Sequence, residues 1–227
     1  SNQEWGELSS GAYGNYGDNS DYIDFYGYLY NWYAVDDDRG ICPDGWQVPT
    51  DEVWMELEIF LGMSPEEAQE IGLRGTDEGG KLKSTGTIEG EDGLWYEPNE
   101  GATNESGFTA LPGGWRSAEY GSFVYMSNSG LFWSSTQSND TRAFTRGFDF
   151  EYSEVGRGSS EMRSGFSVRC VRNSEDAIYG CTDSIACNYD PEATINDFSC
   201  WFAEEYYDCD GNCLNDLNND EICDELE

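Results

Sequence analysis

The sequence contains no histidine, and this absence excludes several kinds of chemistry. Histidine is the usual general base of enzymes and the commonest protein ligand for transition metals. Nucleophile systems that pair serine or cysteine with histidine are therefore excluded. Lysine is almost absent as well, since the chain has only Lys81 and Lys83. Schiff-base chemistry through lysine therefore has few candidate residues.

Positive charge is scarce, because 11 lysine and arginine residues face 46 aspartate and glutamate residues and the net charge is −35 at pH 7. Such a chain repels nucleic acids and anionic membranes, so we expect no nucleic-acid partner and no membrane insertion. The same charge attracts metal cations. An equally good explanation for the scattered charges of the globular part is that they keep a surface protein soluble in salt.

The chain has 8 cysteines but no CxxC pair, which disfavours a zinc site built from cysteine alone. Disulfides are the better interpretation, and they imply an oxidising compartment. No signal peptide or membrane-spanning segment is visible, and the first residues resemble a mature terminus, so we expect an export signal to have been removed. We therefore expect a secreted, extracellular or cell-surface protein.

A change in composition near Asn173 divides the chain into two parts. Residues 1–173 are rich in aromatic residues and glycine, which favours strands and structured loops. Residues 174–227 contain no lysine or arginine and few apolar residues, so disulfides or metal ions must stabilise them. We expect a globular domain over 1–173 and a small tail, rich in cysteine and acidic residues, over 174–227.

One segment of the globular part has a clear helical pattern. Thr50 is a candidate N-cap, and the apolar spacing that follows predicts a helix over residues 51–61. A second helix is predicted after Ser64, because Pro65 suits the first helical position and Glu67 completes a capping box. The side chains of the first helix that we expect to be buried are Trp54, Leu57 and either Phe60 or Leu61.

Strand signals are short and widely spaced. Alternating aromatic residues from Tyr26 to Trp32 predict a strand with an aromatic face, and residues 72–119 are typical of long structured loops. The pattern predicts an α+β domain with short strands, one or two helices and long loops. The later strand-like pieces are Phe123–Met126, Leu131–Ser134, Arg142–Phe150 and Phe166–Val171.

Seven phrases occur in a characteristic order: YGYLYNWYAV from Tyr26, CPDGWQVP from Cys42, GGKLK from Gly79, GATNESGF from Gly101, LPGG from Leu111, FWSST from Phe132 and GFSVRCVR from Gly165. Over residues 5–173 they resemble the Fibrobacter succinogenes major paralogous domain. That family is found in secreted and surface proteins and has no established catalytic activity. The resemblance implies the C-type-lectin-like fold, which formylglycine-generating enzymes and retroelement-diversified binding proteins share.

The same resemblance bears on Cys42 and Cys170, the two cysteines of residues 1–173. The enzyme branch of the fold uses reactive cysteines, whereas these two are better explained as one disulfide between the segment before the first helix and the last strand. Closing a loop of this length would stabilise the domain by about 4–5 kcal/mol. The enzymatic role is therefore not carried over, and we expect no catalytic residues.

The triplet Glu97-Pro98-Asn99 matches the one that holds calcium and sugar in mannose-type C-type lectins. Those lectins also use a Trp-Asn-Asp strand, whereas the late segment here reads Trp133-Ser134-Ser135 and lacks both ligands. A loop turn at Pro98 is the alternative, and it is the interpretation that we adopt.

A stronger metal motif lies in the tail. Oxygen-bearing side chains fall at positions 1, 3, 5, 9 and 12 of an EF-hand-like loop that begins at Asp216, and Ile222 would supply its carbonyl at position 7. This spacing resembles thrombospondin type 3 and dockerin repeats, although Glu221 stands where glycine is preferred. An acidic end without metal is the alternative. The predicted Ca²⁺ ligands are Asp208, Asp210, Asn212, Asp216, Asn218, Asp220, Ile222, Asp224 and Glu227.

Residues 179–213 also resemble a short cysteine-rich module of large secreted bacterial proteins, and the pairing of the tail cysteines stays open. We expect a non-catalytic binding or adhesion module for an extracellular glycan or protein. The alternative is a structural subunit or spacer whose partners are neighbouring subunits of a surface layer, filament or secreted array. The candidate contact residues, for which core packing is the alternative, are Trp95, Tyr96, Trp115, Arg116, Tyr120, Tyr125 and Arg142.

Overall fold

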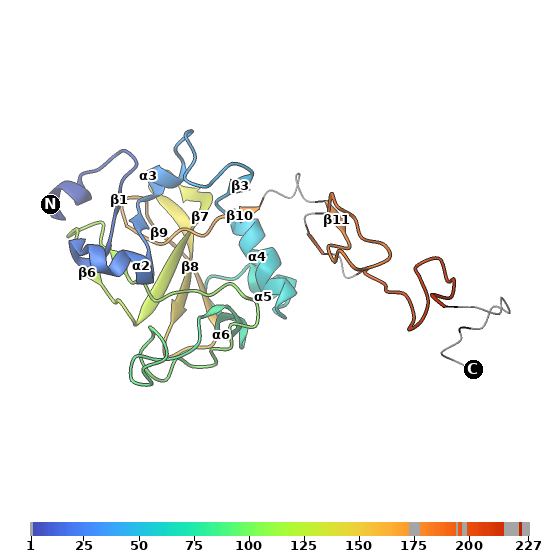
Figure 1. The fold of residues 1–227 in the computed structure, drawn as a ribbon. Coiled ribbons are helices and arrows are strands. Elements are labelled where there is room, and N and C mark those ends of the chain that lie inside the picture. The colour runs from blue at the N-terminus through green and yellow to red at the C-terminus, as the bar shows by residue number, and fades with distance from the viewer. Residues whose placement is uncertain (1, 173–177, 194, 197–198, 216–222, 224–227) are drawn as a thin grey trace. The chain divides into compact units, whose positions relative to one another are not determined.

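The structure is a computed structural model that describes residues 2–172, 178–193, 195–196, 199–215 and 223 (Figure 1). The chain divides into two compact units, an N-terminal unit (Ser1–Val171) and a C-terminal unit (Arg172–Glu227). The composition change near Asn173 falls at this border. Within the described residues, no helix is both long and apolar enough to span a bilayer.

Residues 2–172 form helices and strands, most of them short, that are joined by loops, in agreement with the predicted α+β class (Figure 1). The helices are α1 (Asn2–Gly6), η1 (Tyr16–Asp18), η2 (Ser20–Tyr22), α2 (Ile23–Tyr26), α3 (Trp32–Val35), α4 (Asp51–Phe60), α5 (Pro65–Ala68) and α6 (Glu78–Leu82), where η marks a 3₁₀ helix. The strands are β1 (Tyr13–Gly14), β2 (Leu29–Tyr30), β3 (Trp46–Gln47), β4 (Gly72–Arg74), β5 (Trp115–Arg116), β6 (Phe123–Val124), β7 (Ser129–Asn139), β8 (Arg142–Asp149), β9 (Val155–Glu161) and β10 (Val171–Arg172).

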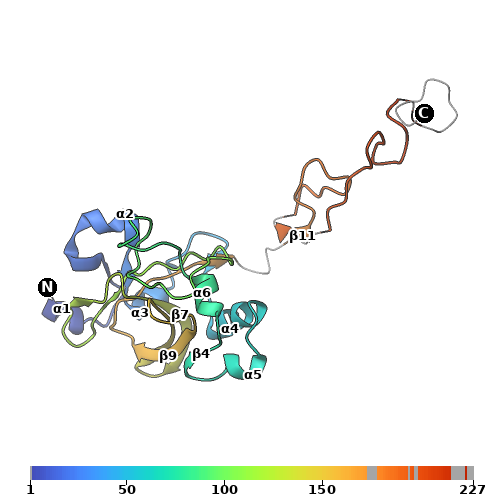
Figure 2. The same cartoon turned by 90° about the horizontal axis from the view of Figure 1, so that it is seen from below.

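The largest sheet has the strand order β4–β9–β8–β7, and every neighbouring pair is antiparallel. Figure 2 shows β4, β7 and β9 within this sheet. Successive side chains of a strand point to opposite faces, so β7 directs Phe132 to one face and Trp133 to the other. Phe132 packs in a core with Trp54 of α4, and Trp133 packs in a second core with Trp32 of α3. The sheet is therefore covered on both faces.

Helix α4 begins where the sequence predicts, because the Thr50 side chain accepts a hydrogen bond from the Val53 amide at 3.2 Å. Trp54 is buried as expected, and Leu57 and Leu61 are partly buried against the same core. Of the predicted alternatives Phe60 and Leu61, Leu61 is therefore the one that packs against the core, and Phe60 is 85% exposed. The buried stripe has helical spacing and consists of Asp51, Trp54 and Glu58, which places Phe60 on the outer side.

Helix α5 begins after Ser64 as predicted, and Ser64 is its N-cap because the Ser64 hydroxyl accepts a hydrogen bond from the Glu67 amide at 3.2 Å. The Glu67 carboxylate does not complete a capping box. It accepts a hydrogen bond from the Gly75 amide at 3.0 Å instead. This contact ties α5 to the turn that follows β4.

The predicted strand from Tyr26 to Trp32 is replaced by α2, β2 and the start of α3. Gly27 ends α2 with a positive φ of 73°, a conformation that favours glycine. Asn31 then caps α3 by accepting a hydrogen bond from the Ala34 amide. The loop region 72–119 also contains β4, α6 and β5, which the sequence pattern did not indicate.

Disulfides stabilise both units. Cys42 and Cys170 are bonded in the N-terminal unit, as the resemblance implies, across a sequence separation of 128 residues. In the C-terminal unit, β11 (Tyr179–Gly180) pairs in parallel with β12 (Ile195–Asn196). The disulfides of this unit are Cys181–Cys200, Cys187–Cys209 and Cys213–Cys223.

Candidate functional site

A ridge of three tyrosine rings, Tyr13, Tyr28 and Tyr30, lies on the surface of the N-terminal unit. Their ring centroids are 5.2 Å apart for Tyr13 and Tyr28, 5.9 Å for Tyr13 and Tyr30, and 6.3 Å for Tyr28 and Tyr30. Tyr28 and Tyr30 share a side because they are two residues apart in extended chain. Tyr13 joins them because it is the cross-strand partner of Tyr30 between β1 and β2.

The backbone beneath this tyrosine ridge is held at several points. The amide and carbonyl of Tyr30 form hydrogen bonds with the carbonyl and amide of Phe166, at 2.8 and 3.0 Å. The Trp133 indole also donates to the Tyr30 carbonyl at 2.7 Å. The buried Asn31 side chain accepts from the Ala12 amide at 2.8 Å and donates to the Ser10 carbonyl at 2.9 Å. The ridge therefore stands on a rigid base.

The first pocket, of about 470 Å³, borders the ridge and is lined by Tyr13, Tyr30, Asp37 and Arg39, among others. Arg39 donates two hydrogen bonds to the Asp37 carboxylate, at 2.8 and 2.6 Å. These bonds lower the pKa of Asp37. The charge of Arg39 is therefore already neutralised by a neighbour within the same pocket.

The second pocket, of about 430 Å³, is lined by Tyr28 and also by Tyr30, which borders both pockets. Its aromatic wall is formed by Phe25, Tyr26, Tyr28 and Tyr30. Phe25 is 58% exposed, so part of this wall is open to solvent. Burial, followed by the neighbouring rings of the ridge, raises the pKa of Tyr30. The Tyr30 hydroxyl is therefore neutral at neutral pH and can both donate and accept hydrogen bonds.

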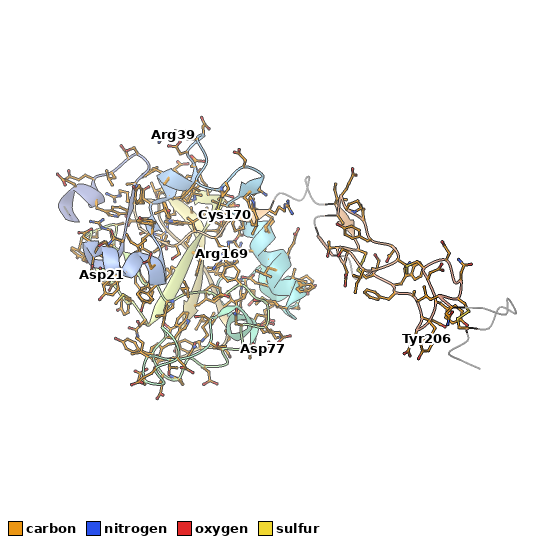
Figure 3. All side chains as sticks on the ribbon, in the orientation of Figure 1. Asp21, Arg39, Asp77, Arg169, Cys170 and Tyr206 are labelled. Carbon is orange, nitrogen blue, oxygen red and sulfur yellow. A yellow bond between two sulfur atoms is a disulfide. The ribbon has the colours of Figure 1, made fainter. Side chains whose placement is uncertain are left out.

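Two charged side chains, Asp24 and Arg169, line the second pocket together with this aromatic wall. Arg169 directly precedes the disulfide residue Cys170 (Figure 3). Its guanidinium donates to the Thr109 carbonyl at 3.2 Å and lies 4.9 Å from the centroid of the Phe108 ring. Burial lowers the pKa of Arg169. Among the residues that the structure describes, no ion pair joins Arg169 to a carboxylate.

Two of the sequence-predicted contact residues are core residues, and we correct their assignment. Trp95 is completely buried, and its indole donates to the Ser84 hydroxyl at 3.0 Å. Arg116 is 6% exposed, and its guanidinium carbon lies 4.2 Å from the Trp5 ring centroid and 4.6 Å from that of Phe123. Aromatic side chains fill the core of a chain that has few aliphatic ones. This explains why Trp95 is buried and why Arg116 is buried against two aromatic rings.

The other predicted contact residues keep some exposure but line neither the first nor the second pocket. Trp115 stacks on Tyr125 with ring centroids 4.6 Å apart. Tyr96 packs edge-on against Phe150. Tyr120 is 67% exposed. The remaining candidate, which donates to the Ser159 hydroxyl at 3.2 Å, is Arg142.

Sequence reasoning did not nominate the tyrosine ridge. The signal was present, because the alternation of Tyr26, Tyr28 and Tyr30 indicated an aromatic face. The contribution of Tyr13 depends on the pairing of β1 with β2, which no local pattern encodes. Arg169 lies far along the chain and was not distinguished from other arginines.

The loop that contains Glu97, Pro98 and Asn99 takes the turn interpretation. The Glu97–Pro98 peptide bond is cis. The Asn99 amide is buried and donates to the carbonyls of Ser84 and Gly86, both at 3.0 Å. Asn99 therefore holds this loop together from inside.

The predicted calcium ligands are only partly visible. The Asp208 carboxylate accepts hydrogen bonds from the amides of Asp210 and Asn212, at 2.9 and 2.8 Å. The Asn212 side chain also donates to it and, as the largest cause, lowers the pKa of Asp208. Over the described ranges, no group of three or more histidine, cysteine, aspartate or glutamate side chains could hold a metal. The candidates outside the described residues are Asp216, Asn218, Asp220, Ile222, Asp224 and Glu227.

The fold and these surfaces define a disulfide-stabilised α+β domain that displays an aromatic face and is followed by a cysteine-rich unit. A model of the Fibrobacter succinogenes major domain matches residues 2–172, and the chain belongs to this family. No curated protein and no solved structure matches the chain.

Proposed function

We propose that this chain is a non-catalytic extracellular binding or adhesion module whose ligand contacts the tyrosine ridge. The observation that carries the proposal is the ridge itself, whose residues line two open pockets and whose backbone is fixed to the core beneath it. Binding sites are typically concave, mostly aromatic or apolar, and supplied with a few polar groups. Both pockets have this composition, and the flat faces of their tyrosine rings suit a sugar or an extended peptide.

Two further parts of the proposal concern location and fold. Four disulfides favour an oxidising compartment, which supports a secreted or cell-surface bacterial protein. The Cys42–Cys170 bond joins the segment before α4 to the end of the domain, which supports a C-type-lectin-like arrangement. A lectin-like base would present its loops as a binding surface.

We also propose that the tail binds Ca²⁺. The disulfide between Cys213 and Cys223 encloses the run that begins at Asp216, so predicted ligands are linked within a short covalent loop. Asp208 and Asn212 already form a compact acidic turn nearby in the sequence. Calcium prefers six to eight oxygen ligands, and the acidic spacing of the tail can supply them.

The ridge is tested by screening the purified full chain against extracellular glycans and proteins, followed by affinity measurements on Tyr28→Ala. Removing a ring from the wall should lower the affinity for the captured ligand by about tenfold, since a buried aromatic contact is worth on the order of 1 kcal/mol or more. Tyr120→Ala is the matched control, because Tyr120 is exposed but lines neither pocket. Equal affinity of both variants for every ligand found would place binding elsewhere and refute the proposal.

The structural alternative makes a different prediction. A spacer or surface-layer subunit would assemble with copies of itself and would be released from cells by a chelator, with no soluble ligand in the screen. That result would also overturn the binding proposal. The disulfides and the acidity fit both functions, so the ligand screen decides between them.

A further inference from the structure

We infer that the second pocket binds the carboxylate of a uronic acid residue in an extracellular glycan through Arg169. This inference rests on the proposed function and specifies the ligand for one of its two pockets. The observation behind it is a partly buried guanidinium that lines an aromatic pocket and lacks an acidic partner among the described residues.

The hydrogen bonding of Arg169 leaves most of its donor capacity available. A guanidinium carries several N–H donors in a planar fork. Within the described part of the chain, Arg169 uses this fork for the Thr109 carbonyl and stacks on the Phe108 ring. A partly buried charge without a counter-ion is unfavourable, which is why burial lowers its pKa. A carboxylate that accepts two parallel N–H bonds satisfies both needs.

Most of the other arginines form an ion pair with a carboxylate of the chain, namely Arg39, Arg74, Arg116, Arg146, Arg157 and Arg163. Among the described residues Arg142 forms no such pair either, but it lines neither pocket and donates to the Ser159 hydroxyl. Acidic groups outnumber basic ones about fourfold, so an arginine can readily find an acidic neighbour. Arg39 illustrates the contrast, because Asp37 in the same pocket already occupies its guanidinium.

The rest of the second pocket suits the neutral part of a sugar. Phe25, Tyr26 and Tyr28 offer ring faces for the C–H groups of a pyranose. The exposed Asp24 can accept hydrogen bonds from sugar hydroxyls, and no ion pair found in the described part of the chain joins it to Arg169. A pocket of about 430 Å³ lies within the size range of small-molecule sites. An aliphatic or simple inorganic anion would leave this wall unused.

The net charge of −35 opposes an anionic ligand at long range, so the magnitudes must be compared. At physiological ionic strength the Debye length is about 8 Å, and charges farther away are largely screened. A partly buried ion pair is screened much less. Added salt should therefore weaken the repulsion more than the contact. Affinity for the acidic sugar is expected to hold or rise between low and moderate salt, unlike non-specific electrostatic binding.

The test uses the full chain and two matched probes, a hexamer of galacturonic acid and the same hexamer with every carboxyl reduced to a hydroxymethyl group. Titrations are made by calorimetry in sodium buffer without added divalent ions, so that calcium cannot bridge two carboxylates. We expect the acidic hexamer to bind about tenfold to a hundredfold more tightly than the reduced one, as a charge-assisted pair would give. Arg169→Gln should abolish this difference, and Arg169→Lys should restore part of it.

Arg163→Gln is the control, because it removes the same charge at a position that lines neither pocket. It should leave the preference for the acidic hexamer within about twofold. Equal binding of both hexamers by the wild type, or an unchanged preference in Arg169→Gln, would overturn this inference while leaving the proposed function intact. If ridge variants such as Tyr28→Ala change the affinity for no ligand at all, the proposed function itself fails.

Discussion

At the scale of single residues, the most informative feature is the network of buried charged side chains that joins α4 to the sheet. Asp51 and Glu58 share the stripe that carries Trp54, and the fully buried Arg146 donates to both carboxylates at 2.6 Å. Helical spacing predicted where this stripe lies, because Trp54 fixes it. It did not predict that carboxylates occupy the stripe, because their partner stands 88 residues beyond Glu58. Local patterns cannot report such a pairing.

Glu58→Ala should lower the free energy of unfolding by about 3–5 kcal/mol. Glu58 accepts hydrogen bonds from both Arg146 and Arg74, so its removal leaves two buried guanidinium groups without this partner. Urea denaturation measures the change. Glu56→Ala, on the exposed side of α4, should change stability by less than about 0.5 kcal/mol. A loss below about 1 kcal/mol for Glu58→Ala would show that the network contributes little.

Stability should also fall in acid, and Asp51 is one cause. Burial acts to raise the pKa of Asp51, but hydrogen bonds and charge from Arg157 and Arg146 outweigh it, and the net pKa is lowered. A carboxylate with a folded pKa below its unfolded value of about 4 stabilises the protein above that pH. This contribution is lost as the pH falls through the folded pKa. Denaturation between pH 5 and 2 should show the loss, and Asp51→Asn should flatten that slope.

At the scale of elements, the sequence predicted segments whose signals are local. The caps at Thr50 and Ser64 placed α4 and α5, because the capping hydrogen bond joins residues three apart. Strand β9 was missed, since Val155–Glu161 contains glycine and serine instead of alternating apolar residues. It is a strand because β8 and β4 pair with it on both sides. For the same reason the tyrosine ridge was not predicted, because its member Tyr13 comes from β1 through cross-strand pairing.

Asn31→Ala should destabilise the N-terminal unit by about 2–4 kcal/mol and weaken ligand binding at the ridge. The substitution removes the N-cap of α3. It also removes the hydrogen-bond partner of the Ala12 amide and of the Ser10 carbonyl. A lost cap costs about 1 kcal/mol, and the partly buried Ala12 amide left unsatisfied costs about 1–3 kcal/mol, whereas the carbonyl of the exposed Ser10 can bond to water. Urea denaturation and ligand affinity are the two measurements.

Asn19→Ala is the control for this substitution. The Asn19 side chain accepts from the Asp21 amide in the exposed cap of η2. Its loss should cost less than about 1 kcal/mol. Equal effects of the two substitutions would mean that Asn31 acts only as a cap and does not hold the segment that carries Tyr13.

At the scale of the whole molecule, composition predicted two parts, and contacts within the chain divide it at nearly the same place. The pairing of the tail cysteines could not be predicted, because spacing alone allows many connectivities. The structure bonds the first to the third and the second to the fourth, which interlocks them, and leaves the last two as a separate loop. A unit with so few apolar residues depends on these bonds for its stability.

Calcium should contribute the remaining stabilisation of the tail. Asp216, Asp220, Asp224 and Glu227 would bring like charges together in one short loop, which opposes compact structure without a cation. A bound Ca²⁺ reverses the sign of that interaction. A ligand at about a hundred times its dissociation constant stabilises the form that binds it by about 2.7 kcal/mol. The Cys213–Cys223 bond restricts the unfolded tail and so favours binding further.

Hydrogen exchange with and without chelator tests this prediction on the full chain. Chelation should reduce protection over residues 208–227 and leave residues 2–172 unchanged, because the Cys42–Cys170 bond and the two cores do not involve the tail. Asp216→Ala combined with Glu227→Ala should have the same effect in millimolar calcium. Glu204→Ala combined with Glu205→Ala removes equal charge outside the predicted ligands and should have no such effect. Identical protection with and without calcium would leave the disulfides alone as the source of order in the tail.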